Sequence, residues 1–162
     1  MVTEVNGIWT VPLSNQHKPY QHVLLKRATN SSAHCVVIVS TVKLIECMER
    51  ETPDPHVAQK IAPHVLKWKP EHVEKERTRL DPSLGAQEMP RAVLTAYENE
   101  GGLLSIFKSN ESVVVATFTN GRHRTRYLQF AGATCIPVEV PIGQLELFMK
   151  HCACTCCNTP VR

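Results

Sequence analysis

The segment at positions 120–126 reads Asn-Gly-Arg-His-Arg-Thr-Arg, which places three arginines and a histidine within seven residues. The pattern after it is helical, so these cations fall in the first turn of a predicted helix. A helix amino end carries about half a positive charge, and each cation there costs about 0.3 to 1 kcal/mol unless an anion lies nearby. An external anion is the simplest remedy, so these residue types predict an anion site.

A strand, a helix and a second strand are predicted around this segment. Residues 113–119 are β-branched and uncharged, which is typical of a buried strand, and they end at an Asn-Gly breaker. Leu128 and Ala131 follow at helical spacing up to Gly132, and residues 134–140 alternate as a strand. A connection of this length can return the chain parallel to the first strand by a right-handed crossover. The helix amino end would then lie at the carboxyl edge of the sheet, where open α/β sheets bind phosphate ligands.

The helical stripes give the arginines different predicted positions. Arg124 shares the stripe of Leu128 and Ala131 and is expected to face the sheet, where its guanidinium needs either a protein carboxylate or a ligand phosphate. Arg122 and Arg126 fall on the outer stripe. There they are either solvated or in contact with nucleic-acid phosphates.

Hydrolysis at phosphorus needs charge neutralisation and a proton acceptor, often with a divalent metal. His123 can serve as the base, because neighbouring arginines lower the pKa of its imidazole and keep it neutral. Alternatively, it donates to phosphate or packs on Tyr127. Glu98 and Glu139 are candidate carboxylates for a metal or for pairing with Arg124, and otherwise are ordinary surface charges.

Residues 113–140 resemble the nucleotide-binding segment of the ParB/sulfiredoxin superfamily, which shares a Gly-x-x-Arg box. The string Phe-Thr-Asn-Gly-Arg-His-Arg-Thr-Arg is most similar to plasmid fertility-inhibition factors of the Osa and FiwA type. The fold that this implies is an α+β (mixed α/β) domain over residues 1–151, in which a small mixed sheet has flanking helices and a C-terminal strand-glycine-helix-strand unit. The resemblance also implies a site for ATP or another nucleotide, formed by Asn120, Gly121, Arg122, His123 and Arg124.

The fertility-inhibition branch implies ATP hydrolysis and DNA cleavage directed against the transferred strand of a competing conjugation or T-DNA transfer system. The chain would then be a DNase and ATPase that uses His123 and Arg124 with a carboxylate and possibly Mg²⁺, and that contacts DNA through Arg122 and Arg126. The alternative is a non-catalytic inhibitor that docks on a type IV secretion ATPase, a coupling protein or relaxase-bound DNA. Sulfinic-acid repair is disfavoured, because sulfiredoxins have a catalytic cysteine where this chain has Arg122.

The composition fits one compact domain. The chain has 162 residues, of which 43% are hydrophobic, and a net charge of +3 that is too small to indicate nucleic-acid binding by itself. No apolar run approaches the roughly 20 residues of a membrane span, and the first fourteen residues do not resemble a signal peptide. We therefore expect a cytoplasmic bacterial protein without membrane insertion.

The remaining pattern predicts further elements and a cysteine-rich end. Strands are expected at 8–13, 23–26, 36–46, 91–97 and 103–108, and helices from 54, at 70–80 and at 141–151. Disulfides are disfavoured in a reducing cytosol, so we expect buried free thiols at Cys35, Cys47 and Cys135 and a flexible tail over 152–162. Zinc sites usually use two separated ligand pairs, and no second Cys-x-x-Cys occurs. The candidate metal ligands in the tail, which are also open to lipidation or redox chemistry, are Cys152, Cys154, Cys156 and Cys157.

Overall fold

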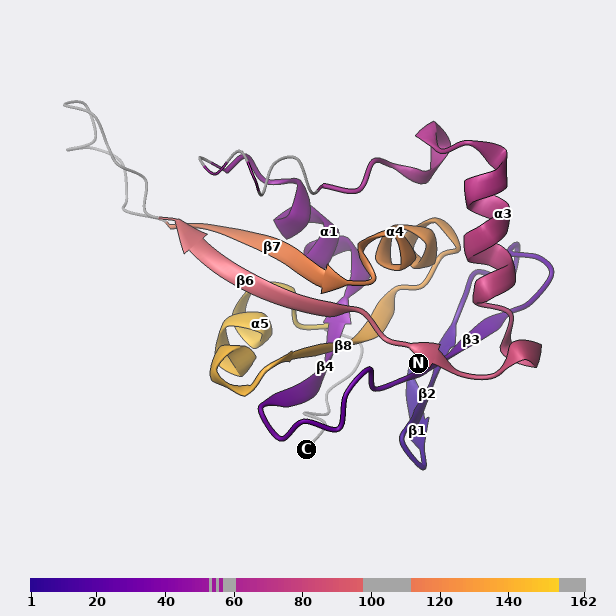
Figure 1. Ribbon diagram of the computed structural model, residues 1–162, viewed down its shortest axis with the longest axis horizontal. Helices are drawn as coiled ribbons and strands as arrows, with labels where there is room; N and C mark the ends of the chain where they lie inside the picture. Colours follow the sequence, from indigo (N-terminus) through magenta and orange to yellow (C-terminus); the bar gives the residue numbers. More distant parts are fainter. Residues whose placement is uncertain (53, 55, 57–60, 98–111, 155–162) are drawn as a thin grey trace.

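The computed structural model describes residues 1–162 except 53, 55, 57–60, 98–111 and 155–162, and it shows two mixed four-stranded sheets with packed helices (Figure 1). The predicted α+β class is confirmed, although a single small sheet was expected. One sheet has the order β1-β2-β3-β5 and the other β4-β8-β6-β7. The strands are β1 (Thr3–Val5), β2 (Ile8–Pro12), β3 (His22–Lys26), β4 (His34–Ser40), β5 (Gln87–Glu88), β6 (Arg91–Tyr97), β7 (Val113–Asn120) and β8 (Cys135–Pro141), and the helices are α1 (Thr41–Glu49), α3 (Pro70–Arg79), α4 (Arg122–Phe130) and α5 (Leu145–Cys152).

The second sheet is the centre of the core. β8 pairs antiparallel with β4 along its whole length and lies beside β6, so that six of its seven residues are buried. α1 packs on β7, and α5 packs on β4. Buried apolar residues of both sheets join in one hydrophobic cluster, which makes the described chain a single packed unit.

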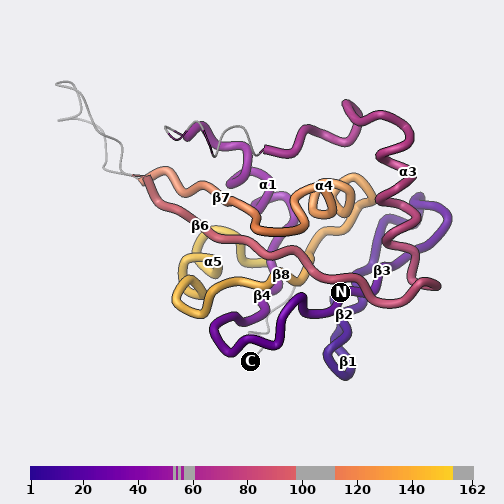
Figure 2. The backbone as a smooth tube through the Cα atoms, in the orientation of Figure 1, coloured from indigo at the N-terminus to yellow at the C-terminus, as the bar shows by residue number. Residues whose placement is uncertain are grey.

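The direction of β8 differs from the expectation. β6 pairs antiparallel with β7 and parallel with β8, so β7 and β8 run in opposite directions with β6 between them. The expected parallel return is therefore wrong, because β6, which precedes β7 in the chain, occupies the place next to it. α4 still begins directly after β7, so its amino end lies at the carboxyl end of that strand. Figure 2 shows α4 between β7 and α3, two segments that are far apart in sequence.

The predicted strand over 36–46 is half correct. The strand ends at Ser40, whose hydroxyl accepts a hydrogen bond from the Lys43 backbone N–H at 3.5 Å and caps α1. Leu44 and Ile45 are buried from a helix rather than from a strand, since their apolar run fits either period. The helix expected from residue 54 falls largely outside the described residues. The next described helical element is a short 3₁₀ turn at Val65–Lys67. The strand expected over 103–108 also lies outside them.

The chain is packed against the core as far as Cys154, the last residue that the structure describes. α5 runs to Cys152, which is buried, and Ala153 pairs with Val39 of β4. Cys154 is joined to Cys135 by a disulfide, with a Cα–Cα distance of 6.1 Å. Residues 152–154 therefore belong to the core, and the expected free thiol at Cys135 is wrong, because α5 carries the chain back beside the start of β8.

Candidate functional site

The amino end of α4 is uncapped by any side chain. Its N-cap is Gly121, and its first turn holds no acidic residue. The Gly121 carbonyl accepts hydrogen bonds from the Thr125 N–H at 2.8 Å and from the Thr125 hydroxyl at 3.0 Å. The helix therefore presents its positive dipole end together with the cationic side chains that follow Gly121.

Gly121 is required by the packing of the turn between β7 and α4. Its φ of +86° lies in the left-handed region, and a Cβ at this position would lie 2.8 Å from the Cα of Pro90. The sequence predicted a glycine that lets the backbone approach a phosphate. The structure supplies a different reason, which is the contact of this turn with the residue before β6.

Arg124 points inward, as its stripe predicted, and is 2% exposed. Its Nε and Nη1 atoms are buried without a hydrogen-bond partner, and no ion pair joins Arg124 to a carboxylate within the described ranges. Burial, followed by the charge of Arg79, lowers the pKa of Arg124 to about 10, while Glu76 and Glu88 act in the opposite direction. Arg124 therefore remains charged at neutral pH and lacks the protein carboxylate that was one of its two expected partners.

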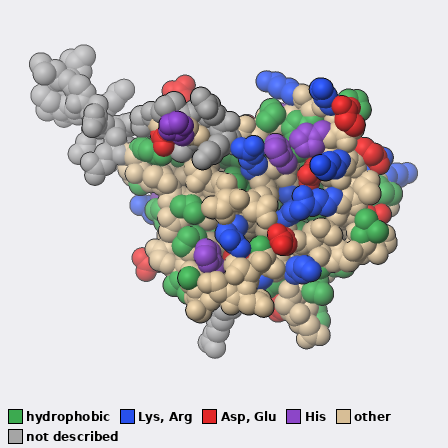
Figure 3. All heavy atoms as spheres, viewed as in Figure 1, with side chains coloured by type: hydrophobic (Ala, Val, Ile, Leu, Met, Phe, Trp, Pro, Cys, Tyr) green, Lys and Arg blue, Asp and Glu red, His purple; other side chains and the backbone are tan. Residues whose placement is uncertain are grey.

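An open pocket of about 990 Å³ lies beside this guanidinium. Its walls come from the end of β7, the first turn of α4, and Glu76 and Arg79 of α3, which packs on α4. Figure 3 shows Lys, Arg and His side chains gathered on the face formed by α3 and α4. The pocket brings together all five residues that were predicted to bind phosphate: Asn120, Gly121, Arg122, His123 and Arg124.

Glu76 is one of the pocket residues that sequence reasoning missed, together with Arg79 and His56. It is 6% exposed, and its Oε2 atom is buried without a hydrogen-bond partner. A usable signal was present, because Glu76 shares the inward stripe of α3 with Val73 and Leu80. A carboxylate on the apolar stripe of an otherwise polar helix indicates a specific role.

His123 packs differently from the expected contact with Tyr127. Its ring meets His72 edge to face at a centroid distance of 5.0 Å and Trp68 at 5.5 Å. Burial lowers the pKa of His123, Arg122 and His72 lower it further, and Glu76 raises it. The expected direction is confirmed, although burial contributes more than the arginine, and a neutral imidazole is available as a hydrogen-bond acceptor.

Arg126 does not lie on an outer surface, so its expected exposure is wrong. It is 2% exposed, its Nη2 pairs with Glu49 Oε1 at 2.5 Å, and its Nε donates to the Ala62 carbonyl at 2.9 Å. α1 and the segment around Ala62 cover this side of α4. The geometric basis for a DNA contact by Arg126 is thereby lost, whereas Arg122 is partly exposed at the pocket.

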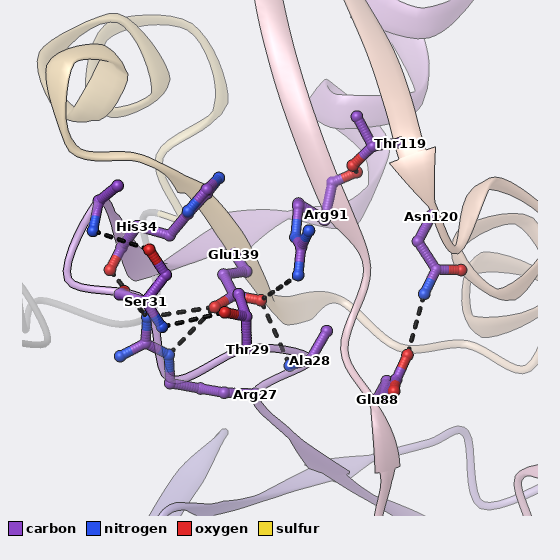
Figure 4. A network of polar contacts seen from close by, with 11 residues as sticks. Arg27, Ala28, Thr29, Ser31, His34, Glu88, Arg91, Thr119, Asn120 and Glu139 are labelled. Carbon is purple, nitrogen blue, oxygen red and sulfur yellow. Dashed lines mark hydrogen bonds and ion pairs between the residues drawn. The ribbon is translucent and has the colours of Figure 1, made fainter.

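Glu139 is neither a surface charge nor a partner of Arg124, and Figure 4 shows the partners that it has instead. It is fully buried in β8, pairs with Arg27 at 3.1 Å and Arg91 at 3.5 Å, and accepts from the Ala28 N–H at 3.3 Å. The surface charge expected at Glu139 is wrong, because β8 lies between β4 and β6 and is buried. Glu98 lies outside the described residues.

Asn120 also contacts a carboxylate, since its Nδ2 donates to Glu88 Oε2 at 3.0 Å (Figure 4).

The described candidate metal ligands at the C-terminus have different partners and do not form one site. Cys152 Sγ lies 3.9 Å from Cys47 Sγ, and Cys154 is in the disulfide, whereas Cys156 and Cys157 fall outside the described residues. No group of three or more His, Cys, Asp or Glu residues placed to hold a metal ion occurs in the part of the chain that is described. Over the same residues, every helix is too short or too polar to cross a membrane.

Comparison with known proteins gives two findings. Residues 36–153 match the model of a protein family described as "Plasmid Fertility inhibition factor". The fold is similar to the crystal structure of Oncogenic Suppression Activity Protein, described as a plasmid fertility inhibition factor and solved as a gold(I) cyanide derivative. The TM-score is 0.64 at 12% identity, over 94% of this chain and 74% of that chain. No curated protein sequence matches this chain significantly.

Proposed function

The chain belongs to the plasmid fertility inhibition factor family, and from this premise we propose that it blocks transfer by a competing conjugative or T-DNA system through nucleotide-dependent cleavage of DNA. The phosphates of ATP or DNA would bind in the pocket at the amino end of α4. The inhibitory role follows from the family, and the chemistry is argued from the pocket.

The proposed chemistry depends on Arg124, because two of its buried guanidinium nitrogen atoms have no hydrogen-bond partner and it forms no ion pair within the described residues. A buried charge without a partner costs several kcal/mol, and the fold would retain it at that cost only if a ligand supplies the missing anion. A phosphate offers several acceptor oxygens, and its hydrogen bonds to arginine are charge-assisted and strong. The open pocket beside Arg124 gives such an anion room to enter.

The other side chains of the pocket complete a site for hydrolysis. Arg79 and Arg122 lie where they would neutralise phosphate oxygens, and the α4 amino end adds its dipole. Neutral His123 or the carboxylate of Glu76 would accept a proton from the attacking water. Mg²⁺ is usually held by one or two carboxylates together with substrate phosphates, and the unpartnered Oε2 of Glu76 fits this role. Such an ion would supply further charge neutralisation.

The test compares turnover in purified variants. Wild-type protein is incubated with ATP and with single-stranded or plasmid DNA, with and without Mg²⁺, beside Arg124→Ala. Arg77→Ala is the matched control, because Arg77 lies on α3 but not in the pocket wall. We expect ATP hydrolysis and DNA cleavage by the wild type and the control, and loss of both in Arg124→Ala.

A second candidate function is inhibition without catalysis, by docking on a secretion ATPase, a coupling protein or relaxase-bound DNA. The cationic face in Figure 3 favours it, because such a surface binds acidic partners without chemistry. If the wild type blocks transfer in a mating assay but hydrolyses neither ATP nor DNA, this candidate replaces the enzyme.

A further inference from the structure

Three aromatic side chains form a cluster beside the phosphate pocket, and one of them lines it. Trp68 and His72 stack at a centroid distance of 4.5 Å and an interplanar angle of 16°. The ring of His123, which lines the pocket, meets both of them edge to face. The cluster of Trp68, His72 and His123 therefore reaches the pocket through His123, and Trp68 and His72 lie next to that ring.

The cluster is held in place and is not hidden in the core. The Trp68 indole N–H donates to the Pro63 carbonyl at 2.9 Å, and His72 lies in the first turn of α3. All three rings are partly exposed. By contrast, the other tryptophan of the chain, Trp9, is 5% exposed inside the hydrophobic core. Aromatic surface is thus exposed beside the pocket, where a ligand that extends out of the pocket can contact it.

We propose that the cluster of Trp68, His72 and His123 stacks an unpaired base of a single-stranded DNA whose neighbouring phosphate lies at Arg124. This inference rests on the proposed phosphate site and adds the side chains that would hold an unpaired base next to it. Arginines that hold the backbone, next to aromatic rings on which bases stack, are the combination by which proteins bind single strands with little sequence preference.

The same arrangement disfavours duplex DNA. In a duplex, both faces of each base are occupied by neighbouring bases, and freeing one for the protein costs a few kcal/mol. A single strand pays much less of this cost. The aromatic cluster therefore selects single-stranded substrate, while the arginines contact the phosphates of either form.

The experiment uses Trp68 as its own reporter. In a Trp9→Phe variant, Trp68 is the sole tryptophan, and its fluorescence is followed during titration with a twelve-residue oligothymidine. A strand of the same length with abasic sites, the matching duplex and ATP form the other arms. We expect quenching by the oligothymidine, weak or no quenching by the abasic strand and the duplex, and a smaller effect of ATP, whose base is not fixed by a strand.

Affinities measured by anisotropy of labelled strands separate the stack from the phosphate site. Trp68→Ala should weaken oligothymidine binding by about 5- to 150-fold, from the stacking energy of one base, and leave abasic binding nearly unchanged. Trp68→Phe should restore most of the loss. Arg124→Ala should weaken both strands.

Each other result has a defined meaning. Equal losses for the abasic strand and oligothymidine in Trp68→Ala, or no binding of any strand by the wild type, would overturn the stacking proposal. Loss at Trp68 with no loss at Arg124 would instead leave the base stack standing and refute the phosphate site.

Discussion

Glu139 and Arg124 are both buried charges, yet their surroundings are opposite. Glu139 is fully buried and is surrounded by Arg27, Arg91 and the N–H of Ala28 (Figure 4). Arg124 is 2% exposed, and two of its nitrogen atoms have no partner. A satisfied buried charge specifies structure, whereas an unsatisfied one indicates a missing ligand. Burial alone would have assigned both residues the same role.

Removal of the satisfied charge should have the largest effect on stability. Glu139→Gln leaves two arginines without their counter-charge, and we expect the free energy of unfolding to fall by about 3 kcal/mol, the lower end for a broken buried pair since both arginines are partly solvated. Urea unfolding measures this, with exposed Glu146→Gln as the control. A loss below about 1 kcal/mol would show that Glu139 is not a structural anchor.

Removal of the unsatisfied charge should weaken binding and spare stability. Arg124→Ala should reduce the affinity for ATP or DNA by about 1.5 to 3 kcal/mol, which is the value of a charge-assisted contact. Arg124→Met keeps most of the volume and removes the unpaired charge, so its unfolding free energy should equal or exceed that of the wild type. Titration calorimetry and urea unfolding give both numbers. If Arg124→Met were strongly destabilised and its ATP affinity were unchanged, Arg124 would have a structural role like that of Glu139.

The turn that positions the unsatisfied charge can be tested with two glycines. Gly121→Ala and Gly7→Ala both place alanine at a positive φ, of +86° and +77°. Only the first also meets Pro90, whereas a Cβ at Gly7 has nothing within 4 Å. Gly121→Ala should therefore cost about 1 kcal/mol more than Gly7→Ala in thermal unfolding. Equal costs would mean that the contact with Pro90 is relieved without strain.

The smallest expected effect is the pH dependence that comes from His123. Its pKa is lowered in the folded protein, so the unfolded chain binds the proton more readily. The stability from this group is fully present above the ordinary pKa near 6.5 and is lost as pH falls from there through the lowered value. The stability difference between wild type and His123→Asn should shrink over that acidic range. A difference that is constant from pH 5 to 8 would contradict the lowered pKa.

What the sequence predicted correctly is local. A β-branched run, a glycine and a helical stripe suffice to place β7, Gly121, α4 and the inward direction of Arg124, because each depends on neighbouring residues only. The α+β class followed from a family resemblance that the family match supports.

The residues that were misplaced depend on distant segments. Arg126 is buried because α1 and the Ala62 segment cover one side of α4, and Glu139 is buried because β8 is central. Glu76 reaches the pocket only through the packing of α3 on α4. The Cys135–Cys154 disulfide joins segments brought together by α5. None of these relations has a short-range signature, since all are decided by which elements become neighbours.

The contact between Gly121 and Pro90 limits which substitutions can reshape the pocket of this protein. One wall of the pocket is fixed by the approach of two backbones and cannot be reshaped by exchanging a side chain. The opposite wall consists of side chains on α3, among them Arg79, which is exposed. Substitutions on α3 can therefore change which ligand this pocket accepts, whereas the turn at Gly121 has no room for a larger side chain.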